Sequence, residues 1–186
     1  MGIKHFFMWF KNHHSEHMQA MRKGDTLPKV GVQIDNLMID MNGVFHNSAQ
    51  KVYKYGNFKP PQRLLRKPRK GPRGLKAQIA VFTDVCKTVE HLFMISKPRK
   101  RLILCVDGPA PISKQNQQRQ RRFRSAMEST EGSLFDSNSI TPGTKFMHYL
   151  SKYIDWYIRK RISESTQWQN VQVIFSNEKA PGEGEH

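Results

Sequence analysis

The apolar residues of this chain fall into short continuous runs that alternate with longer stretches of helical spacing. The runs at 36–41, 102–106 and 169–176 have the length and composition of buried strands. Apolar positions recur every three or four residues over 79–96, and again after a helix start at Thr141-Pro142 that suits an N-cap followed by a first-turn proline. This alternation predicts an α/β domain with a mostly parallel sheet and helices on both of its faces.

The segment 2–21 begins with an aromatic cluster and continues into a polar, histidine-rich half. The cluster favours a first helix that packs against the core, and base stacking by Phe7 or Trp9 is the second interpretation. In the polar half, His13 and His17 have the i, i+4 spacing of a metal-binding pair. Because no Glu stands in a zincin arrangement beside them, a solvated helix face is the favoured interpretation.

A polar helix is predicted to begin near Ser113, after breaks at Pro109 and Pro111, and to run to about residue 124. It contains five basic residues and no acid. The positions that normally form an apolar stripe are here cationic or amide, namely Lys114, Gln118, Arg121 and Arg122. Arginine offers forked donors to an anion, lysine a point charge and glutamine a neutral donor. The face therefore favours a bound anion, with an ordinary solvated face as the alternative.

Acidic residues follow all three predicted strands, namely Asp40, Asp107, and Glu183 with Glu185. If the strands are parallel, these carboxylates meet at the edge of the sheet where α/β proteins bind ligands. Taken alone, Asp40, which stands shortly before the Asn-Gly pair at 42–43, is better explained as a residue that forms a turn. Several carboxylates at one site raise each other's pKa unless a divalent cation neutralises them, and oxygen-only ligands favour Mg²⁺ or Mn²⁺. Two such ions about 4 Å apart clamp a phosphodiester and activate water.

The length and the net charge of the chain restrict the number of domains and the class of binding partner. The 186 residues suit one domain, and 31 Lys and Arg residues against 15 acids give a formal net charge of +16. Such an excess predicts a polyanionic partner, with nucleic acid first. No segment approaches the ~20 apolar residues of a membrane span, and no signal-peptide core is present, so we expect neither a membrane partner nor secretion. Cys86 and Cys105 are expected to be free, buried thiols of a reducing compartment, the cytoplasm before the nucleus.

The segment 51–74 contains nine Lys or Arg residues, four prolines and no acid. Proline keeps it out of regular helix or sheet, which predicts a basic loop able to follow a phosphate backbone. A nuclear-localisation signal at 66–70 is the rival interpretation.

Six segments, in this order, resemble the N-terminal region of the Xrn family of 5′→3′ exoribonucleases: MGIKHFFMWF, LMIDMNGVFH, KPRKRLILCVDGPAP, SKQNQQRQRRFRSA, FDSNSITPGTKFM and APGEGEH. The resemblance covers nearly the whole chain. It implies a nuclease core of the PIN/FEN-like type. It also implies Mg²⁺-dependent hydrolysis of 5′-monophosphorylated single-stranded RNA to 5′-mononucleotides.

The resemblance further implies roles for particular residues. The carboxylates that bind Mg²⁺ and carry hydrolysis in the family match Asp40, Asp107, Glu183 and Glu185. The pocket for the 5′-monophosphate, which is too small for a cap or triphosphate, matches Lys114, Gln118, Arg121 and Arg122. The histidine that stacks on the 5′-terminal base matches His46.

Two departures from the family pattern bear on function. The family takes further aspartates, including an Asp-x-Asp pair, from sequence beyond residue 186. We therefore expect residues 1–186 to be the N-terminal part of an exonuclease domain, incomplete at its C-terminus, as a fragment or a truncated product. The alternative function is a module that binds 5′-phosphorylated RNA without cleaving it, and a nuclease of DNA flaps is a third option. The segment 51–74 is also more basic and proline-rich than the family pattern.

Overall fold

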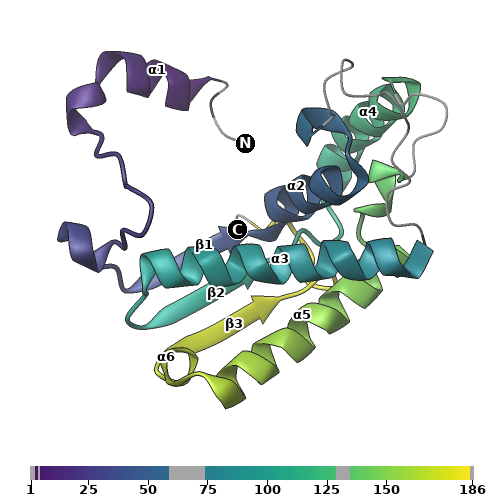
Figure 1. Ribbon diagram of the computed structural model, residues 1–186. Helices are drawn as coiled ribbons and strands as arrows, with labels where there is room; N and C mark the ends of the chain where they lie inside the picture. The colour runs from purple at the N-terminus through teal and green to yellow at the C-terminus, as the bar shows by residue number, and fades with distance from the viewer. Residues whose placement is uncertain (1–2, 4, 59–73, 129–134, 185–186) are drawn as a thin grey trace, which may run out of the picture.

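The computed structural model describes residues 3, 5–58, 74–128 and 135–184, and within α4 it leaves a few side chains undescribed. Three parallel strands form one sheet in the order β1 (Asn36–Asp40), β2 (Arg101–Cys105) and β3 (Gln172–Ser176). Leu37 lies opposite Leu102, and Leu102 lies opposite Val173. The predicted α/β class and the parallel sheet are confirmed, with β3 starting three residues later than expected (Figure 1).

Two long helices, α3 (Gly74–Ser96) and α5 (Lys145–Glu164), run alongside the sheet, and α2 (Met41–Tyr53) follows β1 directly (Figure 1). The predicted polar helix is α4 (Ile112–Glu128). The remaining helical elements are short: α1 (Phe6–His13), α6 (Thr166–Gln169), and 3₁₀ turns at Ser15–His17, Pro28–Val30, Gly56–Phe58 and Ser137–Ser139.

Two helix starts differ from the sequence prediction. The helix expected from Thr141 begins at Lys145, because Thr144 is its cap and accepts a hydrogen bond from the Met147 N–H at 3.3 Å. Gly143, with φ of +85°, separates the two threonines. The pair at 42–43 is not a turn either. It forms the first turn of α2, with Asp40 as the N-cap.

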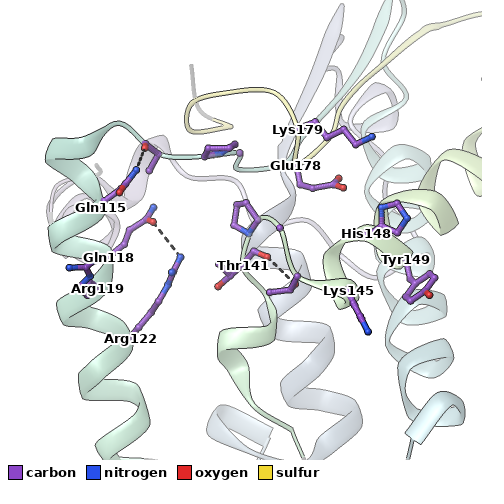
Figure 2. A pocket seen from close by; sticks show the side chains of 16 residues that line it. Gln115, Gln118, Arg119, Arg122, Thr141, Lys145, His148, Tyr149, Glu178 and Lys179 are labelled. Atoms are coloured by element: carbon purple, nitrogen blue, oxygen red, sulfur yellow. Dashed lines mark hydrogen bonds between the residues drawn. The ribbon is translucent and has the colours of Figure 1, made fainter.

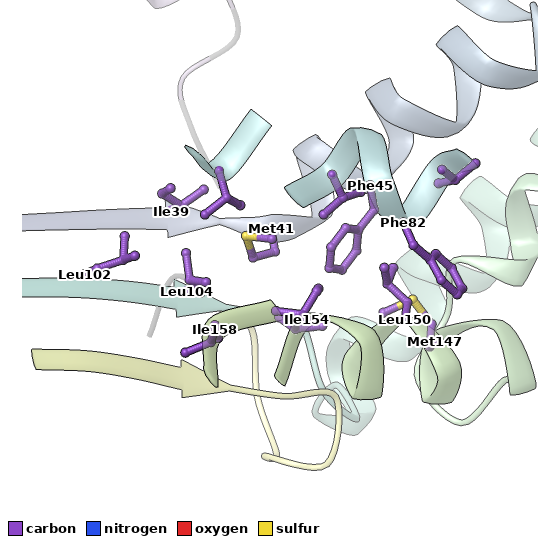
Figure 3. Close-up of a cluster of buried hydrophobic side chains, with 14 of the residues drawn as sticks. Ile39, Met41, Phe45, Phe82, Leu102, Leu104, Met147, Leu150, Ile154 and Ile158 are labelled. Atoms are coloured by element: carbon purple, nitrogen blue, oxygen red, sulfur yellow. The ribbon is translucent and has the colours of Figure 1, made fainter. Parts of the chain in front are cut away.

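The hydrophobic core lies between the sheet and the helices α2, α3 and α5. Apolar side chains of all four elements interdigitate there, as Figure 3 shows for Ile39, Phe45, Phe82, Leu104 and Ile154. Cys86 and Cys105 are both free, the first buried and the second half-buried. Burial raises the pKa of the Cys86 thiol to about 12.

The described helices cover one face of the sheet rather than both. Leu37, Leu102 and Val173 lie on the covered face and pack into or against the core. One residue further along each strand, Met38 and Ile174 are exposed, Met38 to 69%. Burial, not polarity, alternates along β1, where Leu37 and Ile39 face the helices and Met38 between them faces the open side. The apolar run read from the sequence at 36–41 therefore does not show that only one face of the strand is covered.

The aromatic cluster of α1 is not part of the core, so the prediction of core packing is wrong. No residue of α1 is buried, and the helix lies apart from the sheet (Figure 1). Its rings contact each other instead: Phe6 stacks on Trp9 with centroids 5.9 Å apart, and Trp9 stacks on His13 at 5.2 Å.

Candidate functional site

A cavity of about 610 Å³ lies at the carboxyl edge of the sheet, and we call it the inner pocket. Its walls come from the end of β1, the start of α2, the segment after β2, α4, the loop at 137–142 and the segment after β3. Every predicted site residue whose side chain the structure describes lines it: Asp40, His46, Asp107, Lys114, Gln118, Arg122 and Glu183. Segments up to 143 residues apart in the chain therefore meet in one pocket.

Asp40 occupies the junction of β1 and α2. Its Oδ1 accepts a hydrogen bond from the Asn42 N–H at 2.9 Å, which satisfies one of the unpaired donors at the start of the helix. The same bond fixes the orientation of the carboxylate toward the pocket. His46 lies on the same helix, half-buried.

Asp107 is held by the segment that follows β3. Its Oδ1 accepts a hydrogen bond from the Gly184 N–H at 2.7 Å. Beside it, the Gly108 N–H donates to the Gly182 carbonyl at 2.9 Å, and the Gly182 N–H donates to the Pro109 carbonyl at 3.1 Å. These three bonds clamp residues 182–184 onto the segment after β2 and so bring Glu183 into the pocket.

Glycine is the only residue type that fits at position 108. A Cβ added there would lie 1.6 Å from the carbonyl oxygen of Ala180, far inside any van der Waals contact. The two chain segments therefore approach each other as closely as they do because position 108 has no side chain.

An ion pair joins the cationic helix to the acidic edge of the sheet. The Nζ of Lys114 lies 2.7 Å from Oε1 of Glu183, and the two side chains are 26% and 17% exposed. One and two turns further along α4, Gln118 and Arg122 face the same cavity. Arg122 Nη2 donates to Gln118 Oε1 at 3.4 Å (Figure 2). Phe123 is exposed, as expected for a residue outside this face.

Two predicted site residues are not placed by the structure. Arg121 belongs to α4, but its side chain is outside the described atoms. Glu185 lies outside the described residues, as does most of the basic segment 51–74. The assignment of these positions stays a prediction.

The carboxylates of the inner pocket supply only oxygen donors, but their ligand atoms are not drawn into a compact cluster. Within the described part of the chain, the one group of three acidic, Cys or His side chains whose ligand atoms all lie within 4.8 Å is His14, Glu16 and His17. These residues lie in and beside the 3₁₀ turn that follows α1, where Glu16 Oε1 is 3.4 Å from His17 Nε2. The sequence analysis weighed His13 with His17 as a metal-binding pair and favoured a solvated face, and the side chains of Glu16 and His17 are indeed exposed to solvent, with that of His14 partly exposed.

Sequence reasoning missed Tyr55, which also lines the inner pocket. Its Oη is buried and has no hydrogen-bond partner among the described residues. Burial raises the pKa of Tyr55 to about 12, with smaller contributions from Tyr53 and Asp136, so the phenol stays a neutral donor. No pattern in the sequence separates this tyrosine from those that pack in the core.

None of the helices in the described ranges combines the length and hydropathy that a bilayer span requires. The carboxylates and the cationic helix meet at the carboxyl edge of the parallel sheet, where α/β proteins bind ligands, and this α/β core is consistent with the PIN-like class of nuclease cores. The chain matches the family described as XRN 5′-3′ exonuclease N-terminus over residues 1–133 and 128–186, and it belongs to this family.

Curated proteins that are similar in sequence to this chain carry names that agree with this family assignment. The chain is 38% identical to 5′-3′ exoribonuclease 1 of Schizosaccharomyces pombe and 34% identical to 5′-3′ exoribonuclease 1 of Homo sapiens, in both cases over its full length. It is 32% identical to the 5′-3′ exoribonuclease 2 homolog of Drosophila melanogaster, again over its full length. The chain spans 13%, 10% and 23% of these three proteins, so it corresponds to a minor part of each.

Proposed function

We propose that the inner pocket holds the 5′-monophosphorylated end of single-stranded RNA in a Mg²⁺-dependent 5′→3′ exoribonuclease. The observation that carries this proposal is the convergence of three carboxylates and a cationic helix face in one pocket at the carboxyl edge of the sheet. The names of the relatives and the net charge of +16 support an RNA substrate.

In this proposal, α4 binds the terminal phosphate. Lys114, Gln118 and Arg122 offer donors into the pocket, and the helical spacing assigns Arg121 to the same group. Lys114 now neutralises Glu183, so an entering phosphate competes with that carboxylate for the ammonium group. His46, which lines the pocket from α2, is the proposed stacking partner of the terminal base.

Asp40, Asp107 and Glu183 are the proposed metal ligands, with Glu185 as the fourth. Their oxygen donors suit Mg²⁺, and Mn²⁺ is the alternative. When bound, the ion would supply an activated water and neutralise charge on the phosphodiester. The N–H groups of Asn42 and Gly184 each engage one oxygen of an aspartate, which holds the carboxylates in fixed orientations.

A module that binds 5′-phosphorylated RNA without cleaving it is the second candidate. It is favoured by one observation: the described carboxylates of the inner pocket do not form a group with all ligand atoms within 4.8 Å. The phosphate-binding face does not depend on that clustering. Binding and hydrolysis must therefore be measured separately.

The decisive experiment compares binding and shortening of one RNA carrying a 5′-monophosphate or a 5′-hydroxyl, with Mg²⁺ present. Arg122→Gln should weaken binding of the phosphorylated RNA about 10-fold or more and leave the hydroxyl form nearly unchanged, because a hydrogen bond to a charged group contributes about 1.5–3 kcal/mol. Arg124→Gln is the matched control, since Arg124 is exposed on α4 and does not line the inner pocket. Equal losses for both RNAs, or for both variants, would contradict the phosphate pocket.

Hydrolysis is tested with Asp107→Asn, whose amide oxygen can still accept the Gly184 N–H. If the chain shortens RNA, this variant should lose hydrolysis and keep its preference for the 5′-phosphate. A wild-type chain that shows the preference without any shortening would establish the binding module.

We also propose a reducing compartment for this protein, the cytoplasm before the nucleus, because both cysteines are free. Microscopy of the tagged chain tests this proposal, and a secreted product would contradict it.

A further inference from the structure

A second cavity, of about 820 Å³, adjoins the inner pocket, and we call it the outer pocket (Figure 2). The two share Gln118, Arg122 and Thr141 as part of their walls. The charges of the outer pocket differ from those of its neighbour, because a single acid faces four basic side chains: Arg119, Arg122, Lys145 and Lys179.

The acid of the outer pocket is Glu178, which is buried. It accepts a hydrogen bond from the hydroxyl of Ser151 on α5, so its carboxylate is engaged within the fold. The cations predominate at the opening, where Lys145 and Lys179 are exposed. Excess positive charge in a cavity of this size favours an anionic ligand.

The outer pocket opens onto a regular surface of α5. Lys145 and Tyr149 line the pocket, and Lys152, Trp156 and Lys160 continue along the same side of the helix. The spacing is i, i+4, i+7, i+11 and i+15, which keeps all five on one face over about 22 Å. We call these five residues the α5 strip.

The aromatic rings of the α5 strip each contact one neighbouring ring of the helix, Tyr149 with His148 at 5.6 Å and Trp156 with Tyr153 at 5.2 Å, and about half of each side chain stays open to solvent. Tyr149 is 55% exposed and Trp156 is 51% exposed, whereas Leu150 and Ile154 on the opposite side of the helix are buried in the core. Lys160 lies over the Trp156 ring, with Nζ 5.4 Å from its centroid. Exposed rings alternating with lysines form the kind of surface on which single-stranded nucleic acids stack their bases and pair their phosphates.

We propose that the outer pocket and the α5 strip bind a segment of single-stranded RNA separate from the 5′ end in the inner pocket. The lysines would contact phosphates, and Tyr149 and Trp156 would stack on bases. The charge pattern favours RNA over a protein partner, because both acids of α5 are already paired with basic residues: Asp155 with Arg159 at 2.9 Å, and Glu164 with Lys160 of the strip at 3.9 Å. The inference rests on the proposed function only in taking RNA as the ligand.

The test uses the 186-residue chain and a single-stranded RNA of about 20 nucleotides, longer than the 4–16 nucleotides that a stacking platform covers. Affinity is measured for Trp156→Ala with 5′-phosphate and 5′-hydroxyl ends. We expect at least about a fivefold loss that is the same for both ends, since one base–aromatic stack contributes at least this much.

A charge variant gives a second readout in case Trp156→Ala disturbs α5. Lys152→Glu should lower the slope of log affinity against log salt by about 0.7 or more, the contribution of one neutralised phosphate of a single strand. Lys11→Glu is the matched control: it makes the same change in net charge at an exposed position of α1, which lies apart from α5 (Figure 1). Thermal unfolding of each variant verifies that it is folded.

Unchanged affinity in Trp156→Ala, or equal losses in Lys152→Glu and Lys11→Glu, would overturn the proposal. So would competition by a 5′-mononucleotide as effective as competition by the RNA, because the site would then take a free nucleotide. Failure of the proposed function has a different signature: the wild-type chain would not prefer the 5′-phosphate, yet the loss in Trp156→Ala could still be measured with either end.

Discussion

Gly108→Ala is the sharpest perturbation that this structure offers, because a single methyl group tests how the inner pocket is assembled. The added Cβ would lie 1.6 Å from the Ala180 carbonyl oxygen and 2.7 Å from its carbonyl carbon. Both atoms belong to the backbone, so no rotamer change relieves the contact. Either the segment that carries Glu183 or the backbone at position 108 must therefore move by more than an ångström.

The size of the effect follows from the bonds that such a movement breaks. Two backbone hydrogen bonds join positions 108 and 109 to Gly182, and the Gly184 N–H donates to the Asp107 carboxylate. A neutral hydrogen bond contributes about 1 kcal/mol and one to a charged group about 1.5–3 kcal/mol, so losing all three would cost roughly 3–5 kcal/mol. If only the segment after β3 detaches, the cost is smaller, but the pair between Lys114 and Glu183 is lost.

Urea unfolding gives the free energy of unfolding, and binding of 5′-phosphate against 5′-hydroxyl RNA reports on the pocket. For 150–250 residues each kcal/mol at the midpoint shifts Tm by about 2–4 °C, so full loss corresponds to a decrease of roughly 6–20 °C. Gly43→Ala is the control for stability. Position 43 is helical, no atom lies within 4 Å of its added Cβ, and alanine should raise the free energy of unfolding by up to about 1 kcal/mol.

The reasoning is refuted if Gly108→Ala unfolds within about 0.5 kcal/mol of wild type, the usual range of neutral surface changes, and keeps the same preference for the 5′-phosphate. That result would mean that the two segments do not approach as closely as the structure shows.

Three further outcomes are expected. Alkylation by iodoacetamide at mild alkaline pH should be slow at both thiols and slower at Cys86 than at Cys105, because burial raises both pKa values; equal fast labelling would contradict this. Glu90→Gln should lower the free energy of unfolding by about 1–3 kcal/mol, because Arg161 donates to both Glu90 oxygens, at 2.7 and 3.0 Å, and its half-buried charge would lose the carboxylate that balances it. An unchanged urea midpoint would contradict this. Leu104→Ala should cost about 2–5 kcal/mol in the same assay, since Leu104 is fully buried in the core; a cost below 1 kcal/mol would show a loosely packed sheet.

Local sequence patterns were sufficient wherever neighbouring residues set the structure. Short apolar runs predicted the three strands, and helical spacing predicted α3, α4 and α5 with shifts at their ends. The stripe of Lys114, Gln118 and Arg122 lies on one face because helix geometry alone puts residues four apart side by side. The acids after the strands meet because parallel strands share a carboxyl edge.

Local sequence patterns failed where the structure depends on which other segment a residue contacts. The aromatic cluster of α1 looks like a core stripe, yet its rings contact each other, since hydrophobicity does not specify which surface a helix meets. Asp40 reads as part of a turn beside an Asn-Gly pair, but the start of α2 uses it as a cap. The sequence also did not predict the open face of the sheet, because the exposure of that face depends on whether another layer of the protein packs against it.

The sequence by itself determined the class of fold, the excess of positive charge and the residues of the inner pocket that helix spacing and strand ends supply. Only the tertiary structure decided how that pocket is closed, through the contact of Gly108 with the backbone at Ala180, and that Tyr55 faces into it. It alone also placed the outer pocket beside the α5 strip. The physical reason is range: spacing along a helix or strand is set by local backbone geometry, whereas contacts between segments far apart in the chain depend on the packing of the whole core.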